Sequence, residues 1–450
     1  MSSPGSSLQV QLSGRQILAI AFPIALSILV PQFNFIVNNI FLGGLGQREL
    51  AVAGITGVYY LIFAVLGQGL NNGLQALISR RAGENKLTDI GVLFAQGVRI
   101  SIVLSIVGIL LTWLVAPVII RATLSDPESA NMAIRFLHIR ILGLPFLYLY
   151  QMRNALLVGI NQSKFLIIGT TTEAVINIVL DYGLIYGHFG LPAMGFNGAA
   201  IASIASEVAG LLVIFLIITN NSVIRSLQLF KLTKFHLTNT KLILRQSSPL
   251  MLQFAISIIS WEFFYILIEH DGTLALAVSN TMRNLFGFFG CFTWAFAATT
   301  NSMVSNVIGQ GLMEEVMPLI KRIIFFSLGM SIIVFCLLNL FPTAFLSVYG
   351  QGPEFIAAAI PVLRVVSAAM LLMSIGVVWM NAVTGTGNSN MNLITESVAI
   401  VLYCVYTYLV LEVWNLPITV GWASEWLYWM TLFLPSYWYM RSGRWKQRKI

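Results

Sequence analysis

Apolar stretches long enough to cross a lipid bilayer follow one another along almost the whole chain of 450 residues. Hydrophobic residues make up 57% of the sequence and charged residues only 9%, whereas about a quarter of an ordinary soluble protein is charged. So few charged side chains cannot cover a soluble protein of this size, and the mean hydropathy of +0.84 agrees. The composition therefore excludes a soluble protein.

These apolar stretches are continuous and do not alternate between polar and apolar residues. A membrane strand alternates at every second residue, whereas a membrane helix needs about 20 consecutive apolar residues. The sequence therefore predicts an all-α polytopic membrane protein with twelve transmembrane helices. Their expected positions are residues 16–42, 51–78, 91–120, 133–158, 165–187, 195–219, 242–268, 275–303, 317–347, 356–384, 391–411 and 416–440.

The longest polar gap between these stretches lies in the middle of the chain, at residues 220–241. It carries the basic residues Arg225, Lys231, Lys234 and Lys241. We interpret it as a cytoplasmic linker between two six-helix lobes. The N-terminal lobe would comprise residues 1–219 and the C-terminal lobe residues 242–450.

An internal repeat supports this division. When the sequence is compared with itself after the shift that places Pro23 on Pro249, other residues typical of turns and helix bends coincide as well. The further pairs are Gly46 with Gly272, Ser79 with Ser305, and Gly83 with Gly309. We call this displacement the repeat shift. Because six is an even number of helices, the two lobes would share one orientation and be related by an axis along the membrane normal. Repeated halves of this kind are common in secondary transporters, whose binding site lies between them.

Basic residues are distributed unevenly between the loops on the two sides of the predicted membrane. Seventeen of the 25 lie on the side of the N-terminus, and only Arg48 and Arg121 lie in loops on the other side. Cytoplasmic loops hold the excess of Lys and Arg, so we expect both termini in the cytoplasm and the protein in the cytoplasmic (inner) membrane. This bias accounts for the formal charge of +8, and we expect no nucleic-acid partner.

Acidic residues inside the predicted helices are candidates for function, because a charge at membrane depth is costly. Asp181 in the fifth span lies four residues after Asn177, on the same helical face, where the pair could share a proton or a cation. Glu262 lies half-way along the seventh span. A structural hydrogen bond is the alternative for both acids. We interpret four further acids as more structural than functional, namely Glu173, Glu207, Glu396 and Glu425.

Other side chains suggest a bend in the first span and a cavity for apolar molecules. Pro23 and Pro31 each remove a backbone hydrogen bond from the first span and are candidate hinge residues, although prolines also serve helix packing. Aromatic and methionine side chains suit flat, apolar and cationic molecules. The candidate cavity residues are Phe146, Tyr150, Trp261, Met282, Phe288 and Trp379.

Several motifs occur in an order that resembles a known family. They are VNNIFLGGLG followed by LAVAG, then ISRRAGEN, NIVLDYGLIYG, VSNVIGQG and TGTGNS. Together they are similar to the multidrug and toxic compound extrusion (MATE) family of the multidrug/oligosaccharidyl-lipid/polysaccharide flippase superfamily. The resemblance implies two six-helix bundles around a central cavity that export organic cations in exchange for protons or sodium. It also implies that Asp181, Asn177 and Asn154 form a coupling cluster in the N-terminal lobe. Glu262 would match the acid that the sodium-coupled branch carries on the seventh span.

The sequence departs from that family pattern at two places. Where the family has Asp in its first-span motif this chain has Asn38, and the segment LLMSIGVV of the tenth span has no acid. An asparagine takes up no proton at physiological pH, but its carbonyl oxygen can ligate sodium. Coupling would then depend on Asp181 and Glu262, and the ion stays open between sodium and proton.

Two other functions compete with cation-coupled export. A flippase for lipid-linked sugars would need a cationic cavity, to which the intramembrane residues Arg99, Arg153, Arg283 and Arg364 could contribute. A membrane enzyme is not expected, because no nucleophile and base pair, metal-binding motif or ATP-binding loop is present in the sequence. We expect a monomer in the bilayer that binds a small organic cation and needs no cofactor. Sodium or a proton would be the coupling ion, and a sodium at Asp181 would be the only metal.

Overall fold

The computed structural model describes residues 8–229 and 234–448, in which helices are joined by turns and short loops. Lys231 of the linker lies outside the described residues. The N-terminal half contains α1 (Gly14–Gly43), α2 (Gln47–Gly83), α3 (Leu87–Thr123), α4 (Pro127–Arg140), α5 (Leu144–Gly159), α6 (Lys164–Tyr186), α7 (Phe196–Asn220) and α8 (Ser222–Ser226). The C-terminal half contains α9 (Leu237–His270), α10 (Thr273–Gly309), α11 (Val316–Leu340), α12 (Pro342–Ser347), α13 (Pro353–Gly385), α14 (Ser389–Tyr408), α15 (Ile418–Gly421) and α16 (Ser424–Arg441).

This helical architecture confirms the all-α prediction, with four main differences in helix boundaries. The predicted twelfth span, 416–440, is divided into α15 and α16, and α16 begins at Ser424. The predicted fourth span is divided into α4 and α5 by a 3₁₀ turn at Ile141–Gly143, because Pro145 at the start of α5 has no N–H to continue the ladder. The predicted ninth span ends at Leu340, just before Pro342. The predicted linker contains α8 and the first turn of α9, which begins at Leu237.

Ten helical segments of the described chain are long and apolar enough to cross a membrane, with α4 and α5 counted as one. Helices α10 (37 residues) and α16 (18 residues) fall outside this set. Both pack against α13 in the C-terminal half. The chain is therefore a multi-pass membrane protein.

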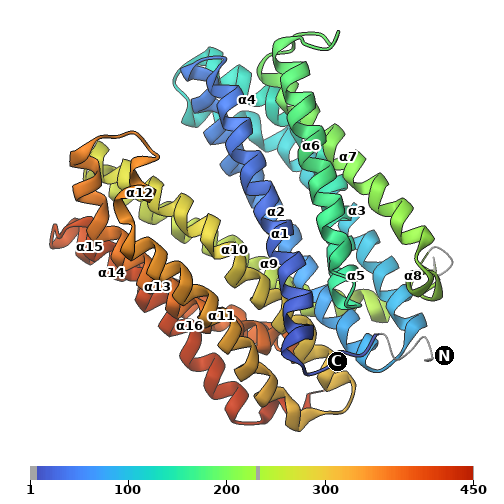
Figure 1. The fold of residues 1–450 in the computed structure, drawn as a ribbon. Coiled ribbons are helices and arrows are strands. Elements are labelled where there is room, and N and C mark those ends of the chain that lie inside the picture. Colours follow the sequence, from blue (N-terminus) through green and yellow to red (C-terminus); the bar gives the residue numbers. More distant parts are fainter. Residues whose placement is uncertain (1–7, 230–233, 449–450) are drawn as a thin grey trace.

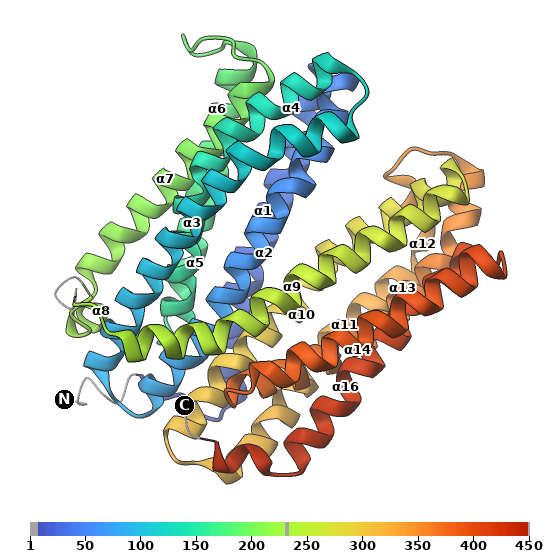
Figure 2. The ribbon, with the colours of Figure 1, turned by 180° about the vertical axis from the view of Figure 1, so that it is seen from behind.

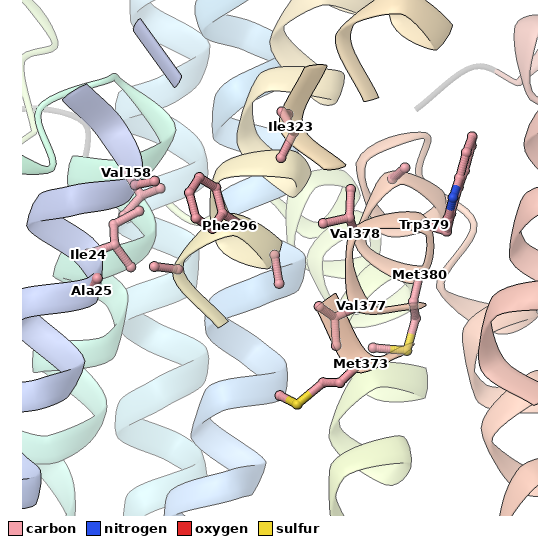
Figure 3. Packing of buried hydrophobic residues seen from close by; sticks show 14 of the residues in the cluster. Ile24, Ala25, Val158, Phe296, Ile323, Met373, Val377, Val378, Trp379 and Met380 are labelled. Carbon is pink, nitrogen blue, oxygen red and sulfur yellow. The ribbon is translucent and has the colours of Figure 1, made fainter. Parts of the chain in front are cut away.

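The helices form two lobes that meet at one end and diverge at the other (Figure 1). The N-terminal lobe is α1–α7 and the C-terminal lobe is α9–α16, and both ends of the described chain lie where the lobes meet. The view from behind shows the same divergence between α4 and α12 (Figure 2). Buried side chains of both lobes share one hydrophobic cluster, in which Ile24 and Val158 lie on the side of Phe296 opposite Val378 (Figure 3).

A close approach between the lobes is the symmetric crossing of α2 and α10. A side chain at Gly83 would collide with the backbone of Asn306, and one at Gly309 would collide with the backbone of Arg80. The repeat shift converts each of these two contacts into the other. Only glycine allows the backbones to approach so closely, and this explains why glycine occurs at both positions.

The segment that precedes α1 is bonded to both lobes at this closed end. Gln9 Nε2 donates to the carbonyl oxygen of Gly83 at 2.9 Å in the N-terminal lobe. The backbone N–H of Val10 donates to Asn306 Oδ1 at 3.1 Å in the C-terminal lobe. Asn306 Nδ2 also donates to the carbonyl oxygen of Leu8 at 2.9 Å. We call residues 8–12 the N-terminal strap.

Helix α1 runs without interruption through both candidate hinge residues. Pro23 and Pro31 lie inside it, and its start is capped by Ser13, whose side chain accepts from the backbone N–H of Gln16. A hinge at these prolines therefore stays a prediction.

Candidate functional site

Polar side chains of α1 and α6 meet inside the N-terminal lobe. Asn34 Nδ2 of α1 donates to Asn177 Oδ1 of α6 at 2.7 Å. One helical turn further along each helix stand Asn38 and Asp181. Two flanking bonds, from Ser163 to the carbonyl oxygen of Ile20 and from Tyr186 to that of Phe41, run in the same register along the two helices. This register places Asn38 at the level of Asp181. We call Asn34, Asn38, Asn177 and Asp181 the amide cluster.

Several polar atoms of the amide cluster, including the donor Asn177 Nδ2, have no hydrogen-bond partner among the described residues. Asp181 is fully buried, and neither of its carboxylate oxygens has a hydrogen-bond partner among the described residues. The side-chain oxygens of Asn34 and Asn38 are buried without a partner there as well. A buried carboxylate is stable only with a proton, a cation or donors, and small hard cations prefer carboxylate and amide oxygens. The cluster can therefore hold either a proton or a cation such as sodium.

Asn34 belongs to this cluster although it was not among the predicted site residues. It precedes Asn38 by four residues in the segment FNFIVNN, the same spacing that singled out Asn177 and Asp181. This four-residue spacing could have identified Asn34 as a site residue from the sequence.

Asn154, which the resemblance assigned to the coupling cluster, bonds to the neighbouring residue of its own helix, α5. Its Oδ1 accepts from Arg153 Nη2 at 2.9 Å. The Arg153 guanidinium lies 3.8 Å from the centre of the Tyr150 ring. Tyr150 therefore contacts an arginine of its own helix rather than the cavity described below.

Glu207 forms a structural ion pair nearby, as its interpretation as a structural acid implies. Arg140 Nη2 lies 2.5 Å from Glu207 Oε1, and Nη1 donates to Oε2 at 3.2 Å. The same guanidinium stacks 4.0 Å above the ring of Tyr60. The pair ties α4 to α7.

A cavity of 440 Å³ lies in the C-terminal lobe. Its walls come from α9, α10, α13, α14 and α16. Gln32 of α1 and Leu61 of α2 also line it, so the cavity borders the cleft between the lobes. Aromatic side chains form much of the wall, namely Phe254, Trp261, Phe286, Trp294, Tyr403, Tyr428 and Trp429.

Two carboxylates, Glu396 of α14 and Glu425 of α16, line this aromatic cavity. Glu396 accepts hydrogen bonds from the Tyr428 hydroxyl and, at 3.3 Å, from Gln253 Nε2. Glu425 accepts from the indole N–H groups of Trp261 at 3.3 Å and Trp429 at 3.1 Å. All these donors are neutral, and neither carboxylate forms an ion pair in the described part of the chain. The Arg283 guanidinium lies 5.6 Å from the centre of the Trp261 ring. When ionised, the two carboxylates together with the aromatic wall would favour an organic cation.

The structure distributes the six predicted cavity residues over several environments. Trp261 lines the cavity. Met282 and Trp379 belong to the buried hydrophobic core, where Trp379 packs edge-on against Tyr437 at 5.1 Å between ring centres. Phe288 meets Phe33 of the other lobe at 5.7 Å. Phe146 is half-buried on α5 and, like Tyr150, belongs to the N-terminal lobe.

Glu262, predicted as an ion-coupling residue, stays a prediction. Glu262 is half-buried on α9 next to Trp261 and does not line the cavity. Adjacent residues on a helix point about 100° apart, and on this turn of α9 Ser260 and Trp261 line the cavity whereas Glu262 does not. Glu396 and Glu425, interpreted as structural from the sequence, are the acids that line it.

The match to a family model follows the same two halves. The model of the MatE family matches residues 23–183 and again residues 249–409, two stretches that the repeat shift superposes end to end. The chain belongs to the MatE family. Members of this family are transporters rather than enzymes.

Individual MatE relatives are distant in sequence but close in fold. A "Probable multidrug resistance protein NorM" of Synechocystis sp. is 27% identical over 198 residues, which cover 44% of this chain and 43% of that protein. The protein of the same name in Neisseria meningitidis serogroup A is 22% identical over 351 residues, 78% of this chain and 76% of that protein. The structure of a MOP superfamily transporter from Pyrococcus furiosus superposes with a TM-score of 0.89 at 18% identity, covering 100% of both chains. That likeness supports the twelve-helix, two-lobe MATE fold.

Proposed function

We propose that this MatE protein exports small organic cations from the cell by antiport with sodium or protons, as a monomer in the bilayer. The observation that carries the proposal is the aromatic cavity of the C-terminal lobe with Glu396 and Glu425 in its wall. Its two carboxylates have only neutral donors as hydrogen-bond partners among the described residues. A lipid-linked sugar phosphate would meet the wrong charge there, so the cavity favours export of cations over a flippase.

The amide cluster of the N-terminal lobe is our candidate for coupling to an ion gradient. Its unpartnered oxygens on Asp181 and Asn38 are buried between α1 and α6, whereas the aromatic cavity lies in the C-terminal lobe. Binding of a cation there would neutralise Asp181 and bond the helices α1 and α6 together more tightly. Release of the ion would loosen the contact between α1 and α6 again. The ion would therefore bind one arrangement of α1 more tightly than the other and shift the balance between them.

The lobes meet at the end that carries both termini, and the excess of basic residues favours a cytoplasmic location for that end in the inner membrane. The arrangement would then be open to the outside, and alternating access would require the lobes to separate at the cytoplasmic end. Single cysteines at Ser226 and Gly190, in a variant without the three natural cysteines, test the orientation. An impermeant reagent applied to intact cells should label position 190 and not 226. Labelling of 226 but not 190 would reverse the orientation.

Transport by the purified protein in proteoliposomes tests the proposed function. The substrate is ethidium, a fluorescent organic cation, and carboxyfluorescein serves as an anionic control. Sodium and proton gradients are imposed separately. We expect ethidium transport driven by at least one of the two gradients and no transport of carboxyfluorescein. Gradient-driven transport of carboxyfluorescein without ethidium transport would contradict the proposal.

A further inference from the structure

A second hollow, unconnected with the proposed export of cations, lies on the outer side of the N-terminal lobe. It is a groove of 380 Å³ with α3 and α7 as its walls and α5 as its floor. Of these, α3 and α7 lie on the side of the N-terminal lobe away from α10–α16 (Figure 2). Leu229, which follows α8, also lines the groove. In a membrane this side of the lobe faces lipid.

The lining of this groove is apolar except for two arginines. Val98 of α3 and Leu211, Ile214 and Phe215 of α7 form the apolar walls. Phe215 is 47% exposed, which places its ring at the rim on the lipid side. Such walls suit an acyl chain, because burial of each methylene group contributes about 0.8 kcal/mol relative to water.

The two arginines, Arg99 on the wall and Arg153 on the floor, supply positive charge inside the groove. Arg153 is only 2% exposed, and its Nε and Nη1 atoms have no hydrogen-bond partner among the described residues. Its contacts to Asn154 and to the Tyr150 ring are with uncharged groups. Glu173 of α6 lies close enough to interact electrostatically, but the described residues contain no ion pair between them within 4 Å.

Arg99 is held at the level of the linker between the lobes. Its Nη1 donates to Gln96 Oε1 at 3.2 Å. Gln96 is fully buried, and its Nε2 donates to the carbonyl oxygen of Lys234 at 2.9 Å. This bond places the backbone of Lys234 next to Gln96. A headgroup bound by Arg99 would lie beside the linker, one helical turn from Gln96.

We propose that this groove binds an anionic phospholipid, with its phosphate between Arg99 and Arg153 and an acyl chain along Val98, Ile214 and Phe215. The side chains of Arg99 and Arg153 both border the groove, and phosphate oxygens match guanidinium geometry. Basic pockets between membrane helices commonly bind anionic lipid headgroups in this way. A zwitterionic phospholipid offers the same chain but no net charge, so the two arginines give selectivity for the anionic lipid.

Lipid binding to the purified full-length protein tests this proposal. Dioleoyl phosphatidylglycerol and dioleoyl phosphatidylcholine are added to delipidated protein in detergent. Retained lipid is measured by native mass spectrometry, and the thermal unfolding midpoint is measured in parallel. We expect phosphatidylglycerol to bind about ten-fold more tightly than phosphatidylcholine, because charge-assisted hydrogen bonds contribute enough for that ratio. It should also raise the unfolding midpoint more.

Variants separate the contribution of charge from that of the apolar walls. Arg99→Gln should remove the preference for phosphatidylglycerol, and Arg99→Lys should restore part of it. Val98→Trp should fill the groove and weaken binding of both lipids. Arg121→Gln, at the other end of α3, is the matched control and should bind like the natural protein. Because Arg99 is only half-buried, these conclusions do not depend on a variant of the buried Arg153.

Two results would overturn the proposal. Equal binding of both lipids to the natural protein, unchanged in Arg99→Gln, would show that the arginines contact no headgroup. If p-nitrophenyl phosphate displaced phosphatidylglycerol at a concentration below that of the lipid, the groove would be assigned to a soluble anion instead. Either result is independent of ethidium transport, so it leaves the proposed export of cations intact.

Discussion

Equivalent pairs of helices, α1 with α6 and α9 with α14, carry different side chains in the two lobes. In the N-terminal lobe α1 and α6 pair through Asn34, Asn38, Asn177 and Asp181. After the repeat shift their counterparts on α9 and α14 are Ser260, Phe264, Tyr403 and Thr407. The rings of Phe264 and Tyr403 meet edge-on at 5.8 Å, where the other lobe has the pair Asn38 and Asn177.

This difference shows how one repeated backbone can supply two kinds of binding site. Amide and carboxylate oxygens without donors suit a small ion, because they can replace the water molecules of its hydration shell. Aromatic faces with carboxylates that already accept hydrogen bonds suit a large, weakly hydrated organic cation. We therefore assign the coupling ion to the N-terminal lobe and the exported cation to the C-terminal lobe. The following predictions test this division.

The largest effect is expected for Asp181→Asn, which should lower coupled export at least about 100-fold while the protein stays folded. An amide in place of the carboxylate has no charge to balance the ion. Export in proteoliposomes and the unfolding midpoint are the measurements. Asp89→Asn, at an exposed acid on α3, is the control. Normal export by Asp181→Asn would move coupling to another acid, of which Glu262 is the next candidate.

Glu396→Gln and Glu425→Gln should each weaken ethidium binding about ten-fold, because each removes one of the two charges that attract the cation. The dependence of transport on the ion gradient should not change, since the coupling site lies in the other lobe. Fluorescence titration gives the dissociation constant. If either variant changed the ion dependence and left ethidium affinity unaltered, the roles of the two lobes would have to be exchanged.

Asn38→Asp should increase proton-driven export several-fold in sodium-free vesicles. Two carboxylates side by side at Asn38 and Asp181 cannot both be charged in a site of low dielectric constant, so one would hold a proton near neutral pH. The natural protein should respond at least partly to sodium. Strong proton-driven export by the natural protein, unchanged in the variant, would place Asn38 outside the coupling chemistry.

The smallest effect is expected for Asn34→Ala, which removes one oxygen from the amide cluster and the bond to Asn177. We expect a three- to ten-fold higher sodium concentration for half-maximal export, about the contribution of one hydrogen bond, and unchanged ethidium affinity. The sodium titration is compared with that of Asn339→Ala in the other lobe. An unchanged sodium requirement would remove Asn34 from the site.

Hydropathy predicted the number and order of the helices because lipid exposure imposes long apolar runs. It did not predict the break at Ile141, which depends on where Pro145 falls within a span. Among the site residues, Asp181 and Asn177 were recognisable because their spacing places them on one helical face. Depth in the membrane alone did not distinguish Glu262 from Glu396 and Glu425. Their surroundings depend on helix rotation, which the sequence of a single helix does not determine. Met282 and Trp379 were misplaced for the same reason.

The N-terminal strap has a consequence for the rate at which the lobes can part. Because Gln9 is bonded to one lobe and Val10 to the other, separation at this end must break the bonds on one side before any gap forms. Gln310 adds a bond to the carbonyl oxygen of Val10 from the same lobe as Asn306. Each bond contributes about 1 kcal/mol, so the few bonds of the strap slow the separation of the lobes. A tag or fused protein placed directly before the strap would disturb these bonds and change the rate of separation. Turnover is therefore best measured with the tag at the other terminus.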